Sequence, residues 1–263
     1  AVPELVEHGV RPVTVGNDVR EHADVALAVD VDAERVLALA VARVEVAALE
    51  NRPRLEPDAV ERRTCERDDV PAFEDLREVD LDVESLAVYA FSTENWSRTR
   101  DEIDTLMEIF GETIDREFPD LVRQGVRVRF IGRRDRAPEE LQRKMASLER
   151  QTTENTRLRL WIAFDYGGRA EIVEAARRLV ESGVEPREID ENVFAAYLNA
   201  PEMPDPDLLI RKKGELRVST FLLWQLAYSE LVFVDSHWPD FSPRDLESAL
   251  SAYARRRRRF GGR

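Results

Sequence analysis

The chain has 263 residues and a mass of 30.2 kDa, which is enough for one large domain with a buried core. Hydrophobic residues make up 43% of the chain, and no stretch approaches the roughly 18 consecutive apolar residues of a membrane-spanning helix. The chain has a single cysteine, Cys65, which excludes internal disulfides. The formal net charge of −14 argues against a nucleic-acid-binding protein, which needs a basic surface.

The first 82 residues differ in composition from the rest of the chain. Valine and alanine alternate there with acidic residues and arginine, and Phe73 is the one aromatic residue. A core of ordinary density usually contains more aromatic area. The best strand candidate is 25–29, which ends at Asp30, and 33–49 has the pattern of a helix.

From about residue 83 onward, short apolar runs alternate with amphipathic stretches, a pattern typical of a parallel sheet covered by helices. Strands are expected at 86–91, 126–131, 158–164, 208–210 and 231–234. Helices are expected at 101–118, 138–152, 169–182, 191–198, 221–228 and 243–259. Thr99 and Glu102 form a capping box before the first of these helices, and Pro119 is expected to end it. The pattern predicts a single α/β domain with a mainly parallel central sheet flanked by helices.

Polar segments follow three of these strands, at 92–98, 165–169 and 211–219. Because the carboxyl ends of parallel strands meet at one edge of a sheet, we expect these segments to converge there. Arg211, Arg217 and Ser219 suit phosphate oxygens, since a guanidinium group can donate two parallel hydrogen bonds. Each segment taken alone also fits an ordinary loop, helix cap or surface ion pair.

Two further features favour an anion and a metal ion at this edge. Gly167 and Gly168 precede a helix, where backbone N–H groups can approach an anion, although such a pair is more often a turn. Glu230, beside the last strand, suggests a hard divalent cation that arrives with a polyphosphate. His237 is a lone histidine, for which a structural role is favoured over metal binding.

Several motifs together resemble one protein family, the cis-prenyltransferases. They are YAFSTENWSR (89–98), FDYGGRAEI (164–172), PDPDLLIR (204–211), FLLWQLAYSELVF (221–233), HWPDF (237–241) and RRFGG (258–262). They follow in the family's order from about residue 83 to the end. The resemblance implies a homodimeric, Mg²⁺-dependent enzyme that condenses isopentenyl diphosphate with an allylic prenyl diphosphate primer and makes a long-chain polyprenyl diphosphate lipid carrier.

The resemblance also implies roles for individual residues. One set binds the diphosphate of isopentenyl diphosphate: Arg211, Arg217 and Ser219. A second set forms a loop that positions the primer and the condensing carbon, with Asn95 as a catalytic residue: Ser92, Asn95, Trp96 and Arg98. Glu230 is a Mg²⁺ ligand. Arg259 and Gly261 match an Arg-x-Gly element that reaches a diphosphate, often across the dimer interface.

The amino-terminal third departs from the family pattern, which has a strand running into Asp-Gly-Asn. Here Asp30 ends a strand-like run, but Val31 and Asp32 follow it. The resemblance implies that Asp30 takes the place of the family's catalytic, metal-binding aspartate, although the Gly and Asn that follow that aspartate in the family are missing here. Residues 1–82 are either a true divergence, giving a non-enzymatic partner subunit of a heteromeric synthase, or a reading-frame fault upstream of 83–263. The abruptness of the change favours the fault.

Composition and product chemistry bear on the protein's surroundings. An acidic surface with only three lysines fits either a halophilic source or a GC-rich genome that favours arginine codons. The lack of a signal-like start and the cysteine content favour a cytoplasmic location. A lipid product implies peripheral contact with a membrane, and an apolar tunnel is expected along one helix, lined by Leu106, Ile109, Phe110 and Ile114.

Overall fold

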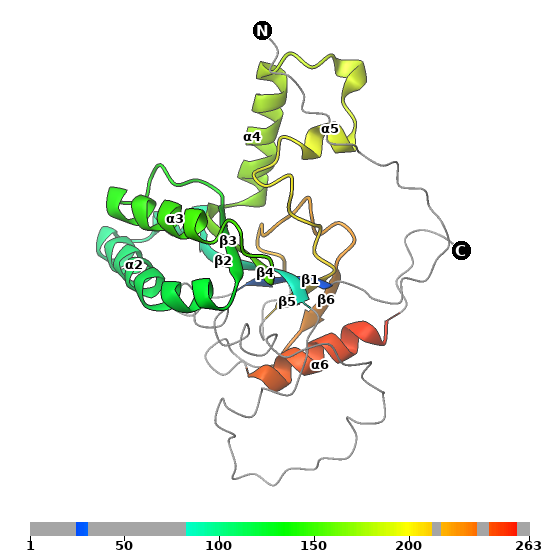
Figure 1. Cartoon of the computed structure of the whole chain (residues 1–263). Coiled ribbons are helices and arrows are strands. Elements are labelled where there is room, and N and C mark those ends of the chain that lie inside the picture. The colour runs from blue at the N-terminus through cyan, green and yellow to red at the C-terminus, as the bar shows by residue number, and fades with distance from the viewer. Residues whose placement is uncertain (1–24, 31–82, 212–216, 236–241, 257–263) are drawn as a thin grey trace.

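A computed structural model describes residues 25–30, 83–211, 217–235 and 242–256 (Figure 1). Its centre is a six-stranded sheet in the order β3-β4-β2-β1-β5-β6, in which every neighbouring pair is parallel. The strands are β1 Val25–Asp30, β2 Val83–Ser92, β3 Val126–Ile131, β4 Leu158–Tyr166, β5 Leu208–Arg211 and β6 Glu230–Phe233. The fold class expected from the sequence, an α/β domain with a parallel sheet, is confirmed.

The amino-terminal strand β1 lies in the middle of this sheet. It pairs with β2 on one side and with β5 on the other. The strand predicted before Asp30 is therefore present, and the sheet is not confined to residues 83–263. The helix expected at 33–49 lies outside the described residues.

One face of the sheet is covered by α2 Arg100–Arg123, α3 Glu139–Gln151 and α6 Pro243–Ala254. Their apolar faces pack on alternate strand residues. Phe110 of α2 packs edge-on against Phe130 and at a tilt against Phe164, with ring centroids 6.3 and 5.2 Å away. Side chains that alternate across each strand thus supply this core and the one on the opposite face. Among the described residues, no helix is long and apolar enough to cross a membrane.

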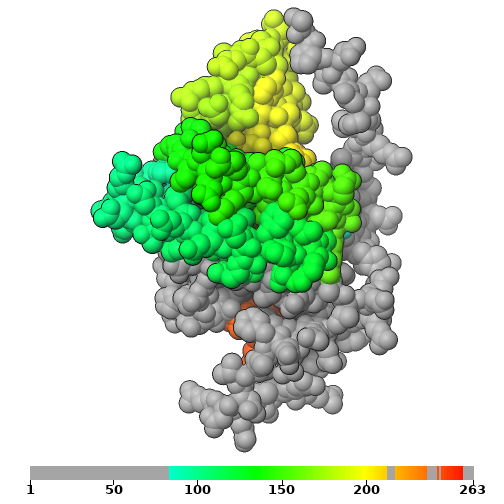
Figure 2. Space-filling view, turned by 60° about the vertical axis from the view of Figure 1, so that its left-hand side comes forward, coloured from blue at the N-terminus to red at the C-terminus, as the bar shows by residue number. Residues whose placement is uncertain are grey.

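The second core lies on the other face, where Tyr89 and Trp161 pack with Phe221 and Leu222 of the segment 217–229. From this side extend α4 Gly168–Glu181, the short 3₁₀ turn η5 Pro186–Glu188 and α5 Glu191–Ala195. They form a projection that rises beyond the green region of the chain in the space-filling view (Figure 2). Gly183, with φ of +74°, follows α4 closely, as its sequence position predicted.

Two expectations about helices are wrong. Pro119 does not end α2, which runs on to Arg123. Proline removes one helical hydrogen bond, but the turn that follows is held by Leu121, whose side chain is completely buried. Residues 221–228 form a series of turns instead of a helix. Thr220 and Leu222 have φ values of +63° and +45°, and such left-handed residues cannot belong to a right-handed helix.

The capping box predicted at the start of α2 is present and gives a pH-dependent contribution to stability. The Glu102 carboxylate accepts hydrogen bonds from the Thr99 hydroxyl at 2.7 Å and from its backbone N–H at 3.0 Å. These two bonds lower the pKa of Glu102. A lowered pKa in the folded state means that the contribution is present above the unfolded-state pKa and is lost as the pH falls through the folded-state value.

We therefore expect Glu102→Gln to lower the Tm near neutral pH, and the difference from the unaltered protein to vanish at a pH below the folded-state pKa. Thermal unfolding followed by circular dichroism at both pH values measures this. Glu108→Gln, an exposed substitution on the same helix, is the control and is expected to show no such pH dependence. A Tm difference for Glu102→Gln that is independent of pH would contradict the assignment.

Candidate active site

The carboxyl ends of the central strands bring the predicted site segments to one edge of the sheet. In the strand register, Asp30 lies opposite Tyr89, and Ser92 lies opposite Tyr166. Val29 of β1 lies opposite Ile210 of β5. The next residues of these two parallel strands, Asp30 and Arg211, are therefore neighbours at the carboxyl ends of the strands. The described residues at the carboxyl ends of β2, β4 and β5 therefore lie at one edge of the sheet, as expected, and Asp30 at the end of β1 lies at the same edge.

The loop 92–98 after β2 contains the 3₁₀ turn η4 Thr93–Ser97. The Oδ1 atom of Asn95 accepts hydrogen bonds from the Ser92 N–H at 2.7 Å and from the Ser92 hydroxyl at 2.9 Å. These two bonds close the loop on itself and fix the direction of the amide group. The Nδ2 donors of Asn95 are then the part of this side chain that can bind an anion.

Gly167 and Gly168 are buried, and their role is close packing between segments. A Cβ atom on Gly167 would lie 2.6 Å from Oγ1 of Thr93, and one on Gly168 would lie 2.7 Å from the carbonyl oxygen of Thr220. The N–H of Gly168 donates to that same oxygen at 2.7 Å. The glycine pair therefore joins the segments after β2, β4 and β5, and the Gly168 N–H is already used in this contact. The anion site suggested by the glycine pair stays a prediction.

Arg211 ends β5 and is almost completely buried, with 1% of its surface exposed. Its Nη2 atom donates to the hydroxyl of Ser219 at 3.2 Å. Ser219 has φ of +51°, which turns the chain back toward the strand end, whereas Arg217 is exposed. Two of the three residues predicted to bind isopentenyl diphosphate are thus in direct contact.

Tyr89 is a buried polar residue at this edge that the sequence analysis did not single out. It lies opposite Asp30, and its hydroxyl donates to the backbone oxygen of Tyr166 at 2.9 Å. Its ring stacks on Phe221 with centroids 4.7 Å apart. Burial raises its pKa to about 12, so Tyr89 stays a neutral hydrogen-bond donor. A tyrosine inside an otherwise apolar strand is the signal that could have identified it.

Asp165 is a second buried group that the sequence analysis did not recognise. Its carboxylate is completely buried and is bound by the guanidinium group of Arg136, with Nε 2.8 Å from Oδ2 and Nη2 on Oδ1. Arg136 in turn lies over the ring of Trp96, 4.6 Å from its centroid. Trp96 is half-buried and packs edge-on against Phe91, with centroids 5.2 Å apart.

Glu230 does not share this edge of the sheet within one chain. It is the first residue of β6 and lies opposite Leu208, whereas Arg211 lies opposite Phe233. Its carboxylate accepts a hydrogen bond from Arg256 of the segment after α6, at 2.6 Å. The expectation that it joins the other residues at the common edge is wrong because the acid begins the last strand, whereas the other segments follow theirs. Its role as a metal ligand stays a prediction.

Other predicted site features are not placed by the structure. Arg259, Gly261 and His237 lie outside the described residues, as do the residues that follow Asp30. Arg98 is exposed at the end of loop 92–98. In the described part of the chain, no three His, Cys, Asp or Glu residues are grouped so that they could hold a metal ion by themselves.

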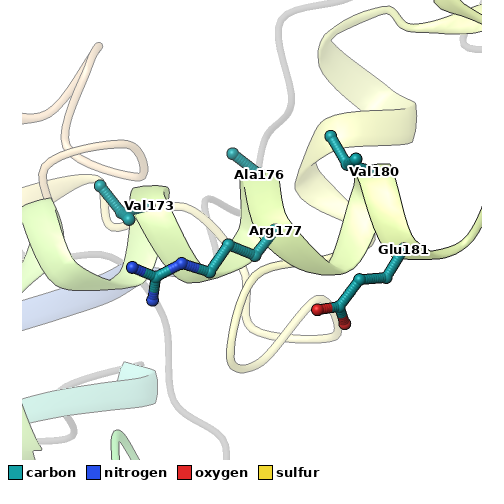
Figure 3. A pocket seen from close by; sticks show the side chains of 5 residues that line it. All are labelled: Val173, Ala176, Arg177, Val180 and Glu181. Carbon is teal, nitrogen blue, oxygen red and sulfur yellow. The ribbon is translucent and has the colours of Figure 1, made fainter.

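A surface hollow on α4 lies away from this edge. Figure 3 shows its lining, which consists of Val173, Ala176, Arg177, Val180 and Glu181. These side chains lie along one helix, and none of them was predicted to bind substrate. The hollow is therefore not the site that the sequence analysis describes.

Comparison with known proteins agrees with this arrangement. Residues 73–261 match the prenyltransferase family model described as putative undecaprenyl diphosphate synthase. An isoprenyl transferase of Thermotoga maritima is 46% identical over 186 residues, which cover 70% of this chain and 80% of that protein. A ditrans,polycis-undecaprenyl-diphosphate synthase of Legionella pneumophila, specific for (2E,6E)-farnesyl diphosphate, is 46% identical over 183 residues, covering 68% and 77%.

The fold is also similar to a solved structure, that of a probable undecaprenyl diphosphate synthase from Campylobacter jejuni. The TM-score is 0.70 at 26% sequence identity, and the match covers 91% of this chain and 100% of that one. The chain is therefore a transferase of prenyl groups. It belongs to the undecaprenyl diphosphate synthase family, which confirms the resemblance seen in the sequence motifs.

Proposed function

We propose that the chain condenses isopentenyl diphosphate with an allylic prenyl diphosphate primer and extends it by cis isoprene units into a long polyprenyl diphosphate. The observation that supports this most strongly is the contact between Arg211 and Ser219 at the edge of the sheet that also carries Asp30 and loop 92–98. Related proteins named as undecaprenyl diphosphate synthases support the same reaction. Their names are those of catalytic proteins and give no support to a partner subunit without activity.

In this proposal the isopentenyl diphosphate group is held by Arg211, Arg217 and Ser219. A guanidinium group gives two parallel, charge-assisted hydrogen bonds to phosphate oxygens, and a hydroxyl group adds a third donor. Asn95 donates from Nδ2 to the primer, while Ser92, Trp96 and Arg98 shape the loop that holds it. Arg259 and Gly261 complete a diphosphate site. The allylic C–O bond breaks and the diphosphate leaves with the electron pair, stabilised by the fixed donors. The double bond of the isopentenyl unit forms the new C–C bond to the allylic carbon, and loss of a proton from that unit gives the new double bond.

Asp30 is the residue that would hold Mg²⁺ together with the substrates. Magnesium is usually bound by one or two carboxylates plus phosphate oxygens, so one carboxylate from position 30 would be enough once the diphosphates are bound. When bound, the ion would neutralise charge on the departing diphosphate. Glu230 is also proposed as a ligand. Since it lies at the opposite end of β6 in its own chain, it would serve the site of a partner subunit.

A homodimer formed through the edge strand β6 would allow this. Three large apolar side chains in and next to β6 are exposed: Tyr228 by 73%, Leu231 by 36% and Phe233 by 44%. Exposed apolar side chains gathered at one edge strand are typical of an interface. The proposed product is a lipid, so we expect it to be released at a membrane surface. We propose that the protein itself is cytoplasmic and contacts the membrane only at its periphery.

The growing prenyl chain is proposed to lie against α2. Phe110 and Ile114 on this helix are buried with 1% exposure, and Leu106 and Ile109 are half-buried beside them. Phe110 and Ile114 are already packed in the core, so in this structure Leu106 and Ile109 are the two members of the set with surface for an apolar chain. A chain that buries its own apolar surface against them gains about 0.8 kcal/mol per buried CH₂ group.

The test is an elongation assay with labelled isopentenyl diphosphate, Mg²⁺ and a farnesyl or geranylgeranyl diphosphate primer. We expect the purified chain alone to make long products, and the products to be absent when Mg²⁺ is removed with a chelator. Activity that appears only after a partner protein is added would contradict the proposal and support a non-enzymatic subunit. Activity that survives complete removal of Mg²⁺ would contradict the metal assignment.

A prediction follows for the isopentenyl diphosphate site. We expect Arg211→Ala to weaken transition-state binding by about 2 kcal/mol or more, because a charged hydrogen-bond partner is lost, and mainly to raise the KM for isopentenyl diphosphate. Steady-state kinetics measure this, and the Tm shows whether the buried site still folds. Arg187→Ala, at an exposed position in η5, is the control. An unchanged KM and kcat for Arg211→Ala would remove Arg211 from the site.

A further inference from the structure

The end of β4 holds a fully buried carboxylate that the proposed chemistry does not use. The Asp165 side chain has no exposed surface, and the residue has φ of +46°, a left-handed conformation that costs energy in a residue other than glycine. A buried charge must be paired to be tolerated. The loop between β3 and α3 supplies the partners. Arg136 binds the carboxylate directly, the guanidinium Nε of Arg133 lies 3.8 Å from Oδ2, and the Arg133 N–H donates to the Asp165 backbone oxygen at 3.3 Å.

Arg136 links Asp165 to the loop 92–98. Two of its nitrogen atoms bind the two carboxylate oxygens, which fixes the plane of the guanidinium group. That plane lies over the ring of Trp96, with the central carbon 4.6 Å from the ring centroid, a distance at which a cation is attracted to the aromatic face. Trp96 is held from another side by Phe91. The contacts therefore run across the ends of β3, β4 and β2, which are neighbours in the sheet.

We propose that Arg136, held in place by Asp165, is a positioning residue for the loop 92–98, which it fixes through Trp96. The proposal rests on the proposed function in one respect, the role given to Asn95. Asn95 and Trp96 are consecutive residues of the same 3₁₀ turn, so a fixed indole ring restricts where the Asn95 amide can lie. The positive charge of Arg136 is paired with Asp165. In this proposal the guanidinium group supports the indole ring of Trp96 and does not bind a phosphate group.

The test compares two conservative substitutions in the same loop. Arg136→Lys keeps the charge but loses the planar fork and its stacking on Trp96. Arg134→Lys is the matched control, because Arg134 also binds a single carboxylate through two nitrogen atoms, Glu149 with both distances at 2.7 Å. We expect Arg136→Lys to lower kcat about ten-fold or more through misplacement of the loop, with the KM for isopentenyl diphosphate within about two-fold. We expect Arg134→Lys to keep its kcat.

Equal kcat values for the two variants would overturn the proposal. A KM that rises about ten-fold in Arg136→Lys, with kcat unchanged, would also overturn it and would make Arg136 a substrate ligand. Asp165→Asn removes the charge that holds Arg136, and we expect it to give the same kcat loss as Arg136→Lys. Additive losses in the double variant would show that the two residues act separately.

A fluorescence measurement tests the proposal even if the unaltered chain has no activity. The quenching of Trp96 by acrylamide is obtained as the difference between each protein and the same protein carrying Trp96→Phe. We expect Trp96 to become more accessible to the quencher in Arg136→Lys and to stay unchanged in Arg134→Lys. The same accessibility in both variants would overturn the proposal. An inactive chain whose Trp96 responds only to Arg136→Lys would refute the proposed function and leave the positioning role standing.

Discussion

Asp30→Asn is expected to abolish turnover, with a loss of about a thousand-fold in kcat, or ~4 kcal/mol in the activation barrier. Asp30 ends the central strand β1, next to Arg211 at the end of β5 and opposite Tyr89 of β2. If the proposed magnesium ion is bound there, the amide removes the negative charge that holds it while keeping the size of the side chain. Steady-state elongation at saturating substrates and varied Mg²⁺ measures the effect.

Asp32→Asn is the control for this experiment, since Asp32 is another acid only two positions further on. We expect it to keep turnover within about two-fold. If Asp30→Asn is as active as the unaltered chain, Asp30 does not replace the aspartate that the family places at the end of this strand. In that case a residue outside the first strand would have to bind the metal.

Gly132→Ala is expected to cost about 3 kcal/mol or more of folding free energy, or to prevent folding altogether. Gly132 follows β3 directly and has φ of +99°. A Cβ atom there would lie 2.2 Å from the backbone oxygen of Phe164, and neither backbone segment can move away without breaking the pairing of β3 with β4. Chemical denaturation, with the yield of soluble protein, measures the loss.

Gly183→Ala separates steric clash from conformational strain. Gly183 also has positive φ, of +74°, but nothing lies within 4 Å of a Cβ atom at that position. Gly183→Ala should therefore lower the free energy of unfolding only by the strain of a left-handed alanine, about 1–2 kcal/mol. If both substitutions lower the free energy of unfolding by the same amount, the close contact with the Phe164 backbone oxygen adds nothing to the strain of the left-handed conformation.

The strands of the fold could be predicted well because they are apolar runs bounded by polar residues. β3 was predicted with its observed bounds, and β2 and β4 extend the predicted strands by only a few residues. The errors arose where packing overrode local preference. Pro119 is a strong local signal for the end of a helix, but the burial of Leu121 beyond it depends on the sheet and cannot be read from neighbouring residues.

The site could be predicted where its residues follow strands, and could not where they depend on loops. Ser92 with Asn95, and Arg211 with Ser219, are close in sequence and were found to be in contact. Arg136 sits in a loop with two other arginines, Arg133 and Arg134, and nothing in its neighbours indicates that its partner is Asp165. Glu230 was misplaced although it directly precedes the strand predicted at 231–234, because the amino end of a parallel strand lies at the sheet edge opposite to the carboxyl ends of its neighbours.

The central position of β1 constrains the order in which the chain can assemble during synthesis. Leu27 of β1 pairs with Leu208 of β5, about 180 positions later, so the contact closes a very long loop of chain. At a ribosomal rate of ~5–20 residues per second, roughly 10–40 s pass between the synthesis of β1 and the synthesis of β5. During this interval one edge of the strand has no native neighbour, and the nascent protein depends on protection from self-association until residues 208–211 emerge.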